Sequence, residues 1–532
     1  KNPLFSHAFE WRFEFPDVLH PETGDFEGFD VVIGNPPYMR IQEIEKYAPA
    51  EKKYYADTYK SAIENYELAN VFYERSMSLL KANGIKSFIM PHKFLNTKNG
   101  KGLRNYINNE KCLTKLLHFG ANMIFDSATT YTAIVFSQKK VQKDFVPQIA
   151  FYKVPSVTKL INHFDEIMFD FSETPYSAIV KNADAYGVDN WILFNTEQEQ
   201  QVFQKIYQKN QKVETLFEEM FVGLQTSGDD VYILHDCVIN EDATLTGIRK
   251  QGKQTFKTKA YRVETAFFKP FLMGKNVRRY ETLQTDKYVF FPYRLEDEKA
   301  VPVTLQELKE HYPLTYAYVM DNETHFKARE SGKAGKQEHW FGYIYPKNLT
   351  KFEQPKLSSM EICTSHPNVT LNNNNLYHTT KVYSWVKKES CHYSYEYLLA
   401  FLNSKVFWWF LMSTGDTLQG DARTIKTNYV NPFPIPQATE AQQAPLVARV
   451  NEILALHASL LPKGGGTEHE VKARIDSLEA EIDVLVYQLY QLTYDDVRVI
   501  DPTFAMPRGA YESGLALLGY TTLEGFNMNQ AD

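Results

Sequence analysis

Four consecutive residues, Asn35-Pro36-Pro37-Tyr38, combine side chains that can hold and stack a planar amine. An exocyclic aromatic amine is a poor nucleophile because its lone pair is delocalised into the ring. The Asn35 amide oxygen can accept one amine hydrogen, and a backbone carbonyl held rigid by the two prolines can accept the other. Two acceptors off the ring plane favour a tetrahedral nitrogen whose lone pair is directed at an electrophile. Tyr38 offers a face for stacking a base, worth ~1–3 kcal/mol.

The tetrapeptide directly follows a short β-branched run, Phe29-Asp30-Val31-Val32-Ile33, which stops at Gly34. In open α/β sheets ligands bind at the carboxyl ends of strands, so this position predicts that the four side chains line a crevice. The alternative is that Asn-Pro-Pro is only a turn that ends a strand. The strand context favours the binding site.

Residues 1 to 140 alternate strand-like and helical patterns. After the run at 29–33, apolar residues at helical spacing from Leu68 to Leu80 predict a helix that ends at Asn83-Gly84 in a left-handed cap. Residues 85–90 and 131–136 read as further strands. Strands separated by helices predict an α/β fold with a mostly parallel, doubly wound sheet.

The 532 residues are too many for one core, and we expect four parts. Residues 1–140 form a partial catalytic domain and 141–210 a connecting segment. Residues 211–436 contain many short strand-like runs, which indicate an α+β module. Residues 437–532 carry two amphipathic helices on either side of Lys463-Gly464-Gly465-Gly466, which predict a helical hairpin. The opening Lys1-Asn2-Pro3 lacks Met and predicts a cut inside a longer protein.

Composition narrows the class of protein. The four cysteines are scattered, which argues against a disulfide scaffold or a structural zinc and fits a reducing cytoplasm. No apolar run is long enough to span a membrane. The net charge is −7, but the stretch from Arg249 to Lys287 has eleven Lys and Arg against three acidic residues, a local balance of +8. That stretch is either a nucleic-acid surface or an ordinary solvated charged face.

The run from Phe29 to Tyr38 resembles motif IV of the gamma-class N6-adenine DNA methyltransferases. The central region resembles the TaqI-like target-recognition domain of type IIG restriction–modification enzymes. The segments that carry this second resemblance are Gly223 to Gly228, Pro270 to Tyr280, Phe352 to Leu357, Ala400 to Ser404 and Phe433 to Pro436. The fold class implied is the C-terminal part of a Rossmann-like methyltransferase sheet, followed by an α+β target-recognition domain and the helical hairpin.

The resemblance implies a bacterial cytoplasmic enzyme that methylates adenine in double-stranded DNA with S-adenosylmethionine, the base being rotated out of the helix. Asn35, Pro36, Pro37 and Tyr38 would be catalytic, and Tyr38 would stack on the base. We expect Phe136 to be the second aromatic of the base pocket, although it could be ordinary sheet core. Tyr131 points to the opposite face of the same strand.

One element of that family is missing. The glycine-rich cofactor loop should precede motif IV, but Gly-Xaa-Gly occurs only at Gly100-Lys101-Gly102 and within Gly464-Gly465-Gly466. We therefore expect an incomplete S-adenosylmethionine site, a chain that is inactive alone, and a partner in the rest of the polypeptide: the N-terminal methyltransferase half and any nuclease. No metal site is expected, and Glu307-Leu308-Lys309 reads as a surface helix, not a nuclease motif.

Five residues of the central region are candidates for contacting DNA. Arginine and glutamine can read guanine and adenine edges, while cations contact phosphates. The candidates are Gln225, Thr226, Lys275, Arg278 and Arg279. Two other functions stay open: a stand-alone defence methyltransferase without a nuclease, and a non-catalytic DNA-binding module.

Overall fold

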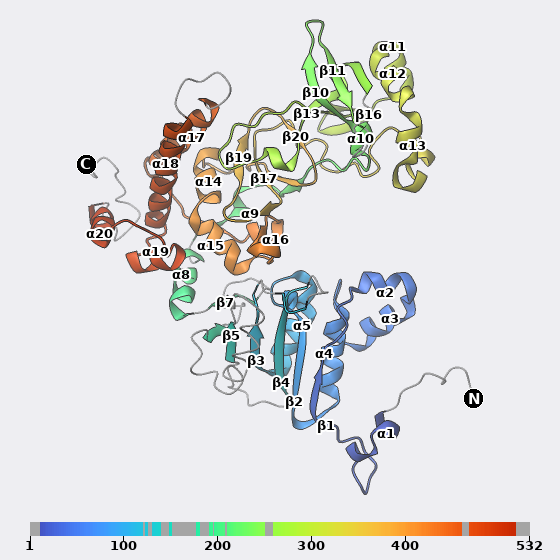
Figure 1. Ribbon diagram of the computed structural model, residues 1–532, viewed down its shortest axis with the longest axis vertical. Helices are drawn as coiled ribbons and strands as arrows, with labels where there is room; N and C mark the ends of the chain where they lie inside the picture. The colour runs from blue at the N-terminus through green and yellow to red at the C-terminus, as the bar shows by residue number, and fades with distance from the viewer. Residues whose placement is uncertain are drawn as a thin grey trace. The chain divides into compact units, whose positions relative to one another are not determined.

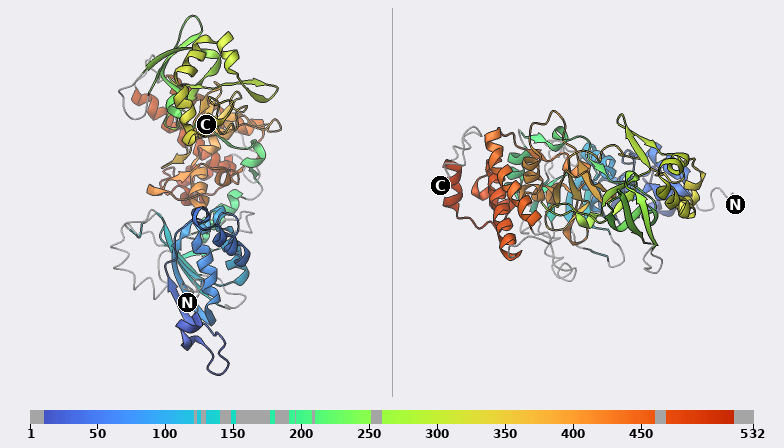
Figure 2. Two further views of the ribbon diagram at one scale, coloured as in Figure 1. Left: turned by 90° about the vertical axis from the view of Figure 1, so that its right-hand side faces the viewer. Right: turned by 90° about the horizontal axis from the view of Figure 1, so that it is seen from above.

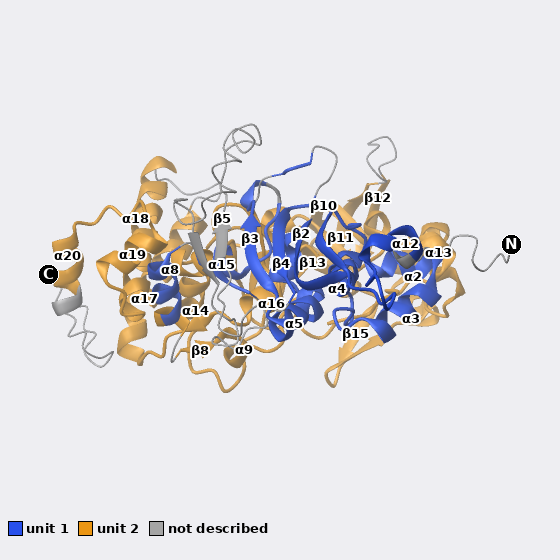
Figure 3. Cartoon of the chain, turned by 90° about the horizontal axis from the view of Figure 1, so that it is seen from below, with its two compact units in different colours: residues 1–204, 412–421 blue, residues 205–411, 422–532 orange. Residues whose placement is uncertain are grey.

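The computed structural model describes residues 11–120, 123–125, 130–139, 148–151, 177–180, 191–194, 196–207, 210–250, 259–459 and 468–517. The chain forms two compact units, residues 1–204 with 412–421 (unit 1) and residues 205–411 with 422–532 (unit 2) (Figure 3). This split is coarser than the four parts expected from the sequence, and the finer boundaries stay a prediction.

Unit 1 is built on a sheet with helices between its first strands (Figure 1). Its elements are α1 (Trp11–Glu14), β1 (Phe29–Gly34), α2 (Ile41–Tyr47), α3 (Pro49–Thr58), α4 (Leu68–Ser78), β2 (Leu80–Pro91), α5 (Lys101–Glu110), β3 (Leu113–His118), β4 (Thr132–Gln138), β5 (Gln148–Phe151), β6 (Ser177–Val180) and β7 (Leu193–Phe194). The helix α8 (Glu197–Tyr207) follows.

The strand order of this sheet is β1-β2-β4-β3-β5-β6-β7. β1 pairs with β2, and β3 with β5, in parallel, whereas β4 runs antiparallel to both β2 and β3. The remaining pairs, β5–β6 and β6–β7, are antiparallel. The expectation of a mostly parallel sheet is therefore wrong, because β4 returns through the short β3–β4 connection and inserts between β2 and β3.

Helices α4 and α5 cover one face of this sheet. Tyr73 of α4 and Leu103 of α5 are fully buried with Leu116, Ala133 and Val135 of the strands in one cluster. The other face of β1 and β2 remains open among the described residues: the side chains of Val31, Ile33 and Ile85 are 61%, 80% and 47% exposed. The sequence predicted helices on both faces of the sheet. In the part of the sheet that the structure describes, helices cover one face of β1 and β2 only.

Unit 2 begins with a set of short strands and helices that matches the α+β module predicted from the sequence. These elements are β8 (Gln211–Lys212), α9 (Val213–Leu216), β9 (Phe221–Val222), α10 (Asp229–Tyr232), β10 (Ile233–Ile239), β11 (Thr244–Arg249), β12 (Lys259–Glu264), β13 (Phe268–Leu272), β14 (Tyr288–Phe290), β15 (Tyr293–Glu296), β16 (Lys299–Pro302), α11 (Leu305–His311), α12 (Pro313–Asp321) and α13 (Glu323–Gly332). The predicted surface helix at Glu307 is α11.

The second half of unit 2 turns from strands to helices. Its elements are β17 (Lys356–Met360), β18 (Ile362–Cys363), β19 (Val369–Asn372), β20 (Tyr377–His378), β21 (Val382–Trp385), α14 (Tyr395–Leu402), α15 (Lys405–Thr414), β22 (Arg423–Thr424), α16 (Thr427–Val430), β23 (Pro434–Ile435), α17 (Glu440–Ser459), α18 (Glu468–Leu489), α19 (Tyr494–Ile500) and α20 (Arg508–Leu517).

Two sheets of unit 2 have the strand orders β12-β11-β10-β14-β13-β20 and β19-β17-β21-β9. The core between them and the helices α11 to α13 is aromatic: Tyr232, Phe290, Phe326 and Tyr343 are all at most 4% exposed and belong to one cluster. Much of the high aromatic content therefore fills this core.

The two long C-terminal helices form the predicted hairpin, running side by side (Figures 1 and 2). Arg449 and Glu452 of α17 pair with Glu481 and Arg474 of α18, respectively. The partner numbers fall as the α17 numbers rise, so the helices are antiparallel. Among all described helices, none is both long and apolar enough to cross a membrane.

Residues 412–421 are part of unit 1 although the chain on both sides of them belongs to unit 2. The Asn96 side-chain amide donates a hydrogen bond of 2.9 Å to the Gly415 carbonyl. Unit 1 is therefore completed by a segment that lies more than three hundred residues further along the chain.

Candidate functional site

The strand before the tetrapeptide is held in place by glycines. Gly28 precedes β1 with a φ of +100°, and a Cβ there would lie 2.7 Å from the carbonyl oxygen of Leu79. Phe29 donates a backbone hydrogen bond of 2.8 Å to the same carbonyl. Because Gly34 then pairs with Phe88 of the parallel strand β2, both strands carry their chains towards the same edge of the sheet.

Asn35-Pro36-Pro37-Tyr38 leaves β1 at this carboxyl edge, as predicted. Asn35 and Pro37 are exposed, Pro36 is buried and Tyr38 is half-buried. The Tyr38 hydroxyl donates a hydrogen bond of 3.1 Å to the Ile89 carbonyl of β2, and burial raises the Tyr38 pKa to about 12. The tetrapeptide is thus fixed at both ends, with its Asn side chain accessible and its Tyr a neutral phenol.

Charged residues next to Tyr38 are of both signs. Arg40 forms a β-bridge with Glu67. Burial raises the pKa of the Glu67 carboxyl, the charges of Lys93 and Arg40 lower it, and Asp416 raises it. Asp416 belongs to the 412–421 segment. This cluster could not be predicted from local sequence patterns, because its members are spread over almost four hundred residues.

Two histidines lie at the same edge of the sheet. His92 follows β2 and His118 ends β3; both are buried, and their rings stack with centroids 4.6 Å apart. Tyr131 lies beside them, its carbonyl accepting a 3.0 Å hydrogen bond from the His92 backbone. Burial lowers the His118 pKa well below its usual range. Both rings are therefore part of the packed interior of unit 1.

Phe136 does not reach this edge. It is paired with Ser87, which is itself opposite Ile33, so it lies one row before Gly34 within the sheet. The antiparallel direction of β4 places the start of the strand, next to Tyr131, at the carboxyl edge instead. The β3–β4 connection, which includes the partly buried Phe125, also lies at the end of β3. The sequence-based choice of Phe136 assumed no strand direction, and the observed direction counts against it.

Thr226, one of the five residues expected to contact DNA, is buried. Its side chain is 2% exposed, and its hydroxyl hydrogen-bonds to the Asp229 carboxylate within a tight turn. Its carbonyl accepts a 3.1 Å hydrogen bond from Arg329. Gln225, the preceding residue, is exposed. In this structure Gln225 is available to a partner and Thr226 stabilises the turn.

Arg279 is also an internal residue. Its side chain is 15% exposed and lies 3.1 Å from the Glu479 carboxylate of α18, itself 22% exposed. Burial of Glu479 raises its pKa, and the charge of Arg279 lowers it. Arg279 therefore joins the module to the helical hairpin within unit 2. Its contact with DNA stays a prediction, which this ion pair makes less favourable.

The basic stretch from Arg249 to Lys287 is largely neutralised by carboxylates brought from elsewhere. Lys259 and Lys269 pair with Asp321 and Glu353 at 2.6 and 2.8 Å. Lys253 and Lys257 lie outside the described residues. Lys275 and Arg278 remain exposed, with Arg278 only 3.8 Å from Glu281. The local balance of +8 thus overstates the free positive surface.

Among the described residues, no glycine-rich loop precedes β1 at the position where a nucleotide cofactor would bind. Ahead of β1, residues 11–28 form a short helix, a 3-10 turn and a further turn through Gly24, with no strand that ends in a glycine-rich loop. Gly100-Lys101-Gly102 begins α5 and packs closely on the carbonyls of Phe94 and Ser61. In the described ranges, no group of three or more His, Cys, Asp or Glu could hold a metal ion.

Two family models match the chain. Residues 3–125 match the Eco57I restriction-modification methylase, and residues 269–435 match the TaqI-like C-terminal specificity domain. The first match contains β1, the tetrapeptide and β2. The second contains Lys275, Arg278 and Arg279.

The chain is also similar to known type II enzymes. The chain is 25% identical over 423 residues to the type II restriction enzyme and methyltransferase RM.Eco57I of Escherichia coli, covering 77% of the chain and 40% of that protein. It is 24% identical over 327 residues to the type II methyltransferase M.XhoI of Xanthomonas vasicola, covering 60% of the chain and 53% of that protein.

A solved structure of the Type IIL restriction-modification enzyme MmeI in complex with DNA has the same fold, with a TM-score of 0.55 at 13% identity over 91% of this chain and 57% of that one. This likeness extends to both units. The chain thus matches two family models in turn: the Eco57I restriction-modification methylase over the segment that carries the candidate site, and the TaqI-like C-terminal specificity domain further along.

Proposed function

We propose that the tetrapeptide is the amine-binding corner of a site-specific DNA adenine N6-methyltransferase of a restriction–modification system, acting in the cytoplasm. The observation that carries the proposal is the placement of Asn35: exposed at the carboxyl end of β1, next to a Tyr38 that is anchored to β2. This edge is where open α/β sheets bind their ligands.

The corner's own residues have distinct tasks in this reaction. The Asn35 side-chain oxygen and the Pro36 carbonyl accept the two amine hydrogens, so that the nitrogen lone pair is turned out of the ring plane. The Tyr38 ring stacks on the base and offsets part of the few kcal/mol that flipping costs. A phenol with a pKa of about 12 keeps its proton at neutral pH, so it adds no negative charge beside the base.

S-adenosylmethionine supplies the methyl group in this reaction, and we propose that the residues described here form only part of its site. The open face of β1 supports the idea that more polypeptide belongs there, since Val31 and Ile33 expose 61% and 80% of their side chains. The chain also spans only 40% of RM.Eco57I. We propose that polypeptide outside residues 1–532 covers this face, extends the sheet past β1 and completes the cofactor site. A nuclease, where the system has one, belongs to that same part.

One alternative has an observation in its favour. Because the cofactor loop is missing, the chain taken alone could act as a non-catalytic DNA-binding module through its specificity domain. The two proposals differ in whether Asn35 matters: methyl transfer requires its side-chain oxygen, and DNA binding by unit 2 does not.

The test is long-read detection of modified bases in cells that express the gene encoding this chain. We expect N6-methyladenine at one sequence motif and its loss with Asn35→Ala. Asn109→Ala, an exposed Asn on α5, is the matched control and should leave the modification unchanged. Modified cytosines, or adenine methylation that survives Asn35→Ala, would contradict the proposal. Phe125→Ala, Tyr131→Ala and Phe136→Ala in the same assay identify the second stacking aromatic.

A further inference from the structure

The C-terminal helices enclose a cavity that none of the residues discussed for DNA modification lines. It has a volume of about 510 Å³ and is lined by residues of α15, α17, α18, α20 and the segment 501–506. Apolar groups such as Leu485, Phe504 and Met506 form most of its wall. Pockets of this size with few polar groups are typical of sites for small organic ligands.

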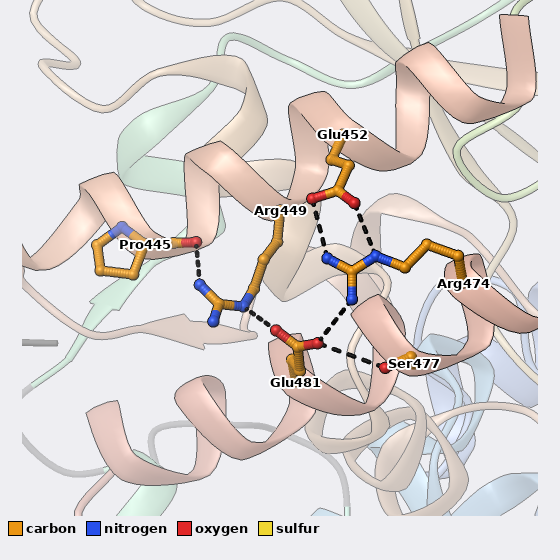
Figure 4. Close-up of polar contacts among 6 residues, drawn as sticks. All are labelled: Pro445, Arg449, Glu452, Arg474, Ser477 and Glu481. Carbon is orange, nitrogen blue, oxygen red and sulfur yellow. Dashed lines mark hydrogen bonds and ion pairs between the residues drawn. The ribbon is translucent and has the colours of Figure 1, made fainter. Parts of the chain in front are cut away.

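Two cations at the wall of the cavity are already paired. Lys405 Nζ lies 2.6 Å from the Asp501 carboxylate. Arg449 Nε lies 2.7 Å from Glu481, and its terminal nitrogen donates to the Pro445 carbonyl at 3.1 Å (Figure 4). Neither cation is therefore free to receive an anionic ligand.

The acidic partner of Arg449 is itself shared. Glu481 also accepts hydrogen bonds from Arg474 and Ser477 at 3.3 and 3.4 Å, and Arg474 in turn holds Glu452 at 2.7 Å (Figure 4). This network crosses between α17 and α18 and makes one wall of the cavity rigid. It leaves no unpaired charge on that wall.

A further carboxylate of α18 that lines the cavity, that of Asp483, has no such compensation. Asp483 is 5% exposed and its Oδ1 accepts one hydrogen bond of 2.9 Å, from the Lys405 backbone. Its cationic neighbour Arg279 is paired with Glu479. Buried polar groups are normally satisfied, so the second carboxylate oxygen of Asp483 calls for a donor from a ligand in the cavity.

The charges around Asp483 decide the sign of the ligand's charge. They are those of Arg279, Glu479, Asp501 and the half-exposed Lys405, and together with Asp483 they leave one excess negative charge. Burial raises the Asp483 pKa to about 6, with Arg279 and Lys405 lowering it, so the carboxyl is ionised at neutral pH. An anion would be repelled, and a hydrocarbon would leave the second Asp483 oxygen without a donor.

We propose that this cavity binds a small organic cation, whose apolar body packs against Phe504 and Met506 and whose ammonium or amidinium group donates to Asp483. The site is independent of methyl transfer, because none of its residues belongs to unit 1.

Benzamidine is a suitable probe, since it joins an aromatic ring to an amidinium group, and benzamide is its neutral counterpart. Calorimetric titration of residues 1–532 should show that benzamidine binds about ten- to a hundredfold more tightly than benzamide. Asp483→Asn should remove this preference. Asp476→Asn removes the same charge from an exposed position of α18 and should leave it intact.

A second variant covers the case in which Asp483→Asn disturbs folding. Val484→Trp keeps the carboxyl but fills part of the cavity that Val484 lines, and should abolish benzamidine binding. Equal affinity of the wild type and Asp483→Asn, equal affinity for the two probes, or the absence of binding at millimolar benzamidine would each overturn the proposal.

Discussion

Arg279→Ala should destabilise unit 2 without a direct effect on DNA. The substitution removes the cation that lies 3.1 Å from Glu479 and that lowers the pKa of the buried Asp483. Breaking a buried ion pair from one side costs about 3–5 kcal/mol, because the partner charge stays buried. At roughly 2 °C per kcal/mol for a domain of this size, the melting temperature should fall by about 6–10 °C.

The pH dependence of this loss has a definite sign. Burial already raises the pKa of Glu479 and that of Asp483, the latter to about 6. Without Arg279, which lowers both, the two pKa values should rise further. An acid with a raised folded-state pKa costs stability when ionised, so the loss is full at pH 8 and shrinks as the pH falls through about 6.

Thermal unfolding followed by circular dichroism at pH 8 and pH 5.5 measures this effect. Arg278→Ala is the control, because the neighbouring Arg278 side chain is 67% exposed and should change the melting temperature little. Two results would refute the reasoning: a melting temperature of Arg279→Ala that matches the wild type at pH 8, or a difference that does not narrow at pH 5.5. If Arg279→Ala is folded and its DNA binding depends less on salt than that of the wild type, Arg279 contacts DNA after all.

Three further predictions concern binding and stability. Lys275→Ala combined with Arg278→Ala should weaken DNA binding and reduce the slope of log affinity against log salt by about 1–2 if both contact phosphates; an unchanged slope in filter binding counts against this placement. Asp483→Asn should stabilise unit 2 at pH 8 by at most about 3 kcal/mol, since the carboxyl pKa rises from 3.8 to about 6, and the gain should vanish below pH 4 in urea titrations. Calorimetry should detect no micromolar S-adenosylmethionine binding by residues 1–532, and such binding would show that the chain holds a complete site.

Local sequence patterns predicted the first strands of unit 1 well. The β-branched run at Phe29 and the runs at 85–90 and 131–136 became β1, β2 and β4. Asn83 does adopt a left-handed conformation, with a φ of 66°, but it lies inside β2, and α4 ends at Ser78. The left-handed conformation of Asn83 was therefore predicted, but its place in the fold was not. Helix and strand patterns overlap in a short apolar run, so the strand was mistaken for the end of the helix.

Contacts between residues that are distant in the sequence could not be predicted from local patterns. The position of β4 between β2 and β3 reversed the expected direction of that strand and placed Phe136 one row before Gly34. The carboxylates that neutralise the basic stretch come from positions such as Asp321, Glu353 and Glu479. A local charge count cannot include partners from these distances, whereas the tetrapeptide was predictable because all its parts are contiguous.

The placement of residues 412–421 has a practical consequence for engineers who wish to change sequence specificity. Suppose that everything after residue 204 is exchanged for the corresponding half of a relative. Such a graft also replaces the segment 412–421, which binds Asn96 and places Asp416 near Glu67. A chimaera should therefore have three joints instead of one, keeping the host's own 412–421 within the foreign half. Transplants built at a single junction should lose methylation even where they bind the new target.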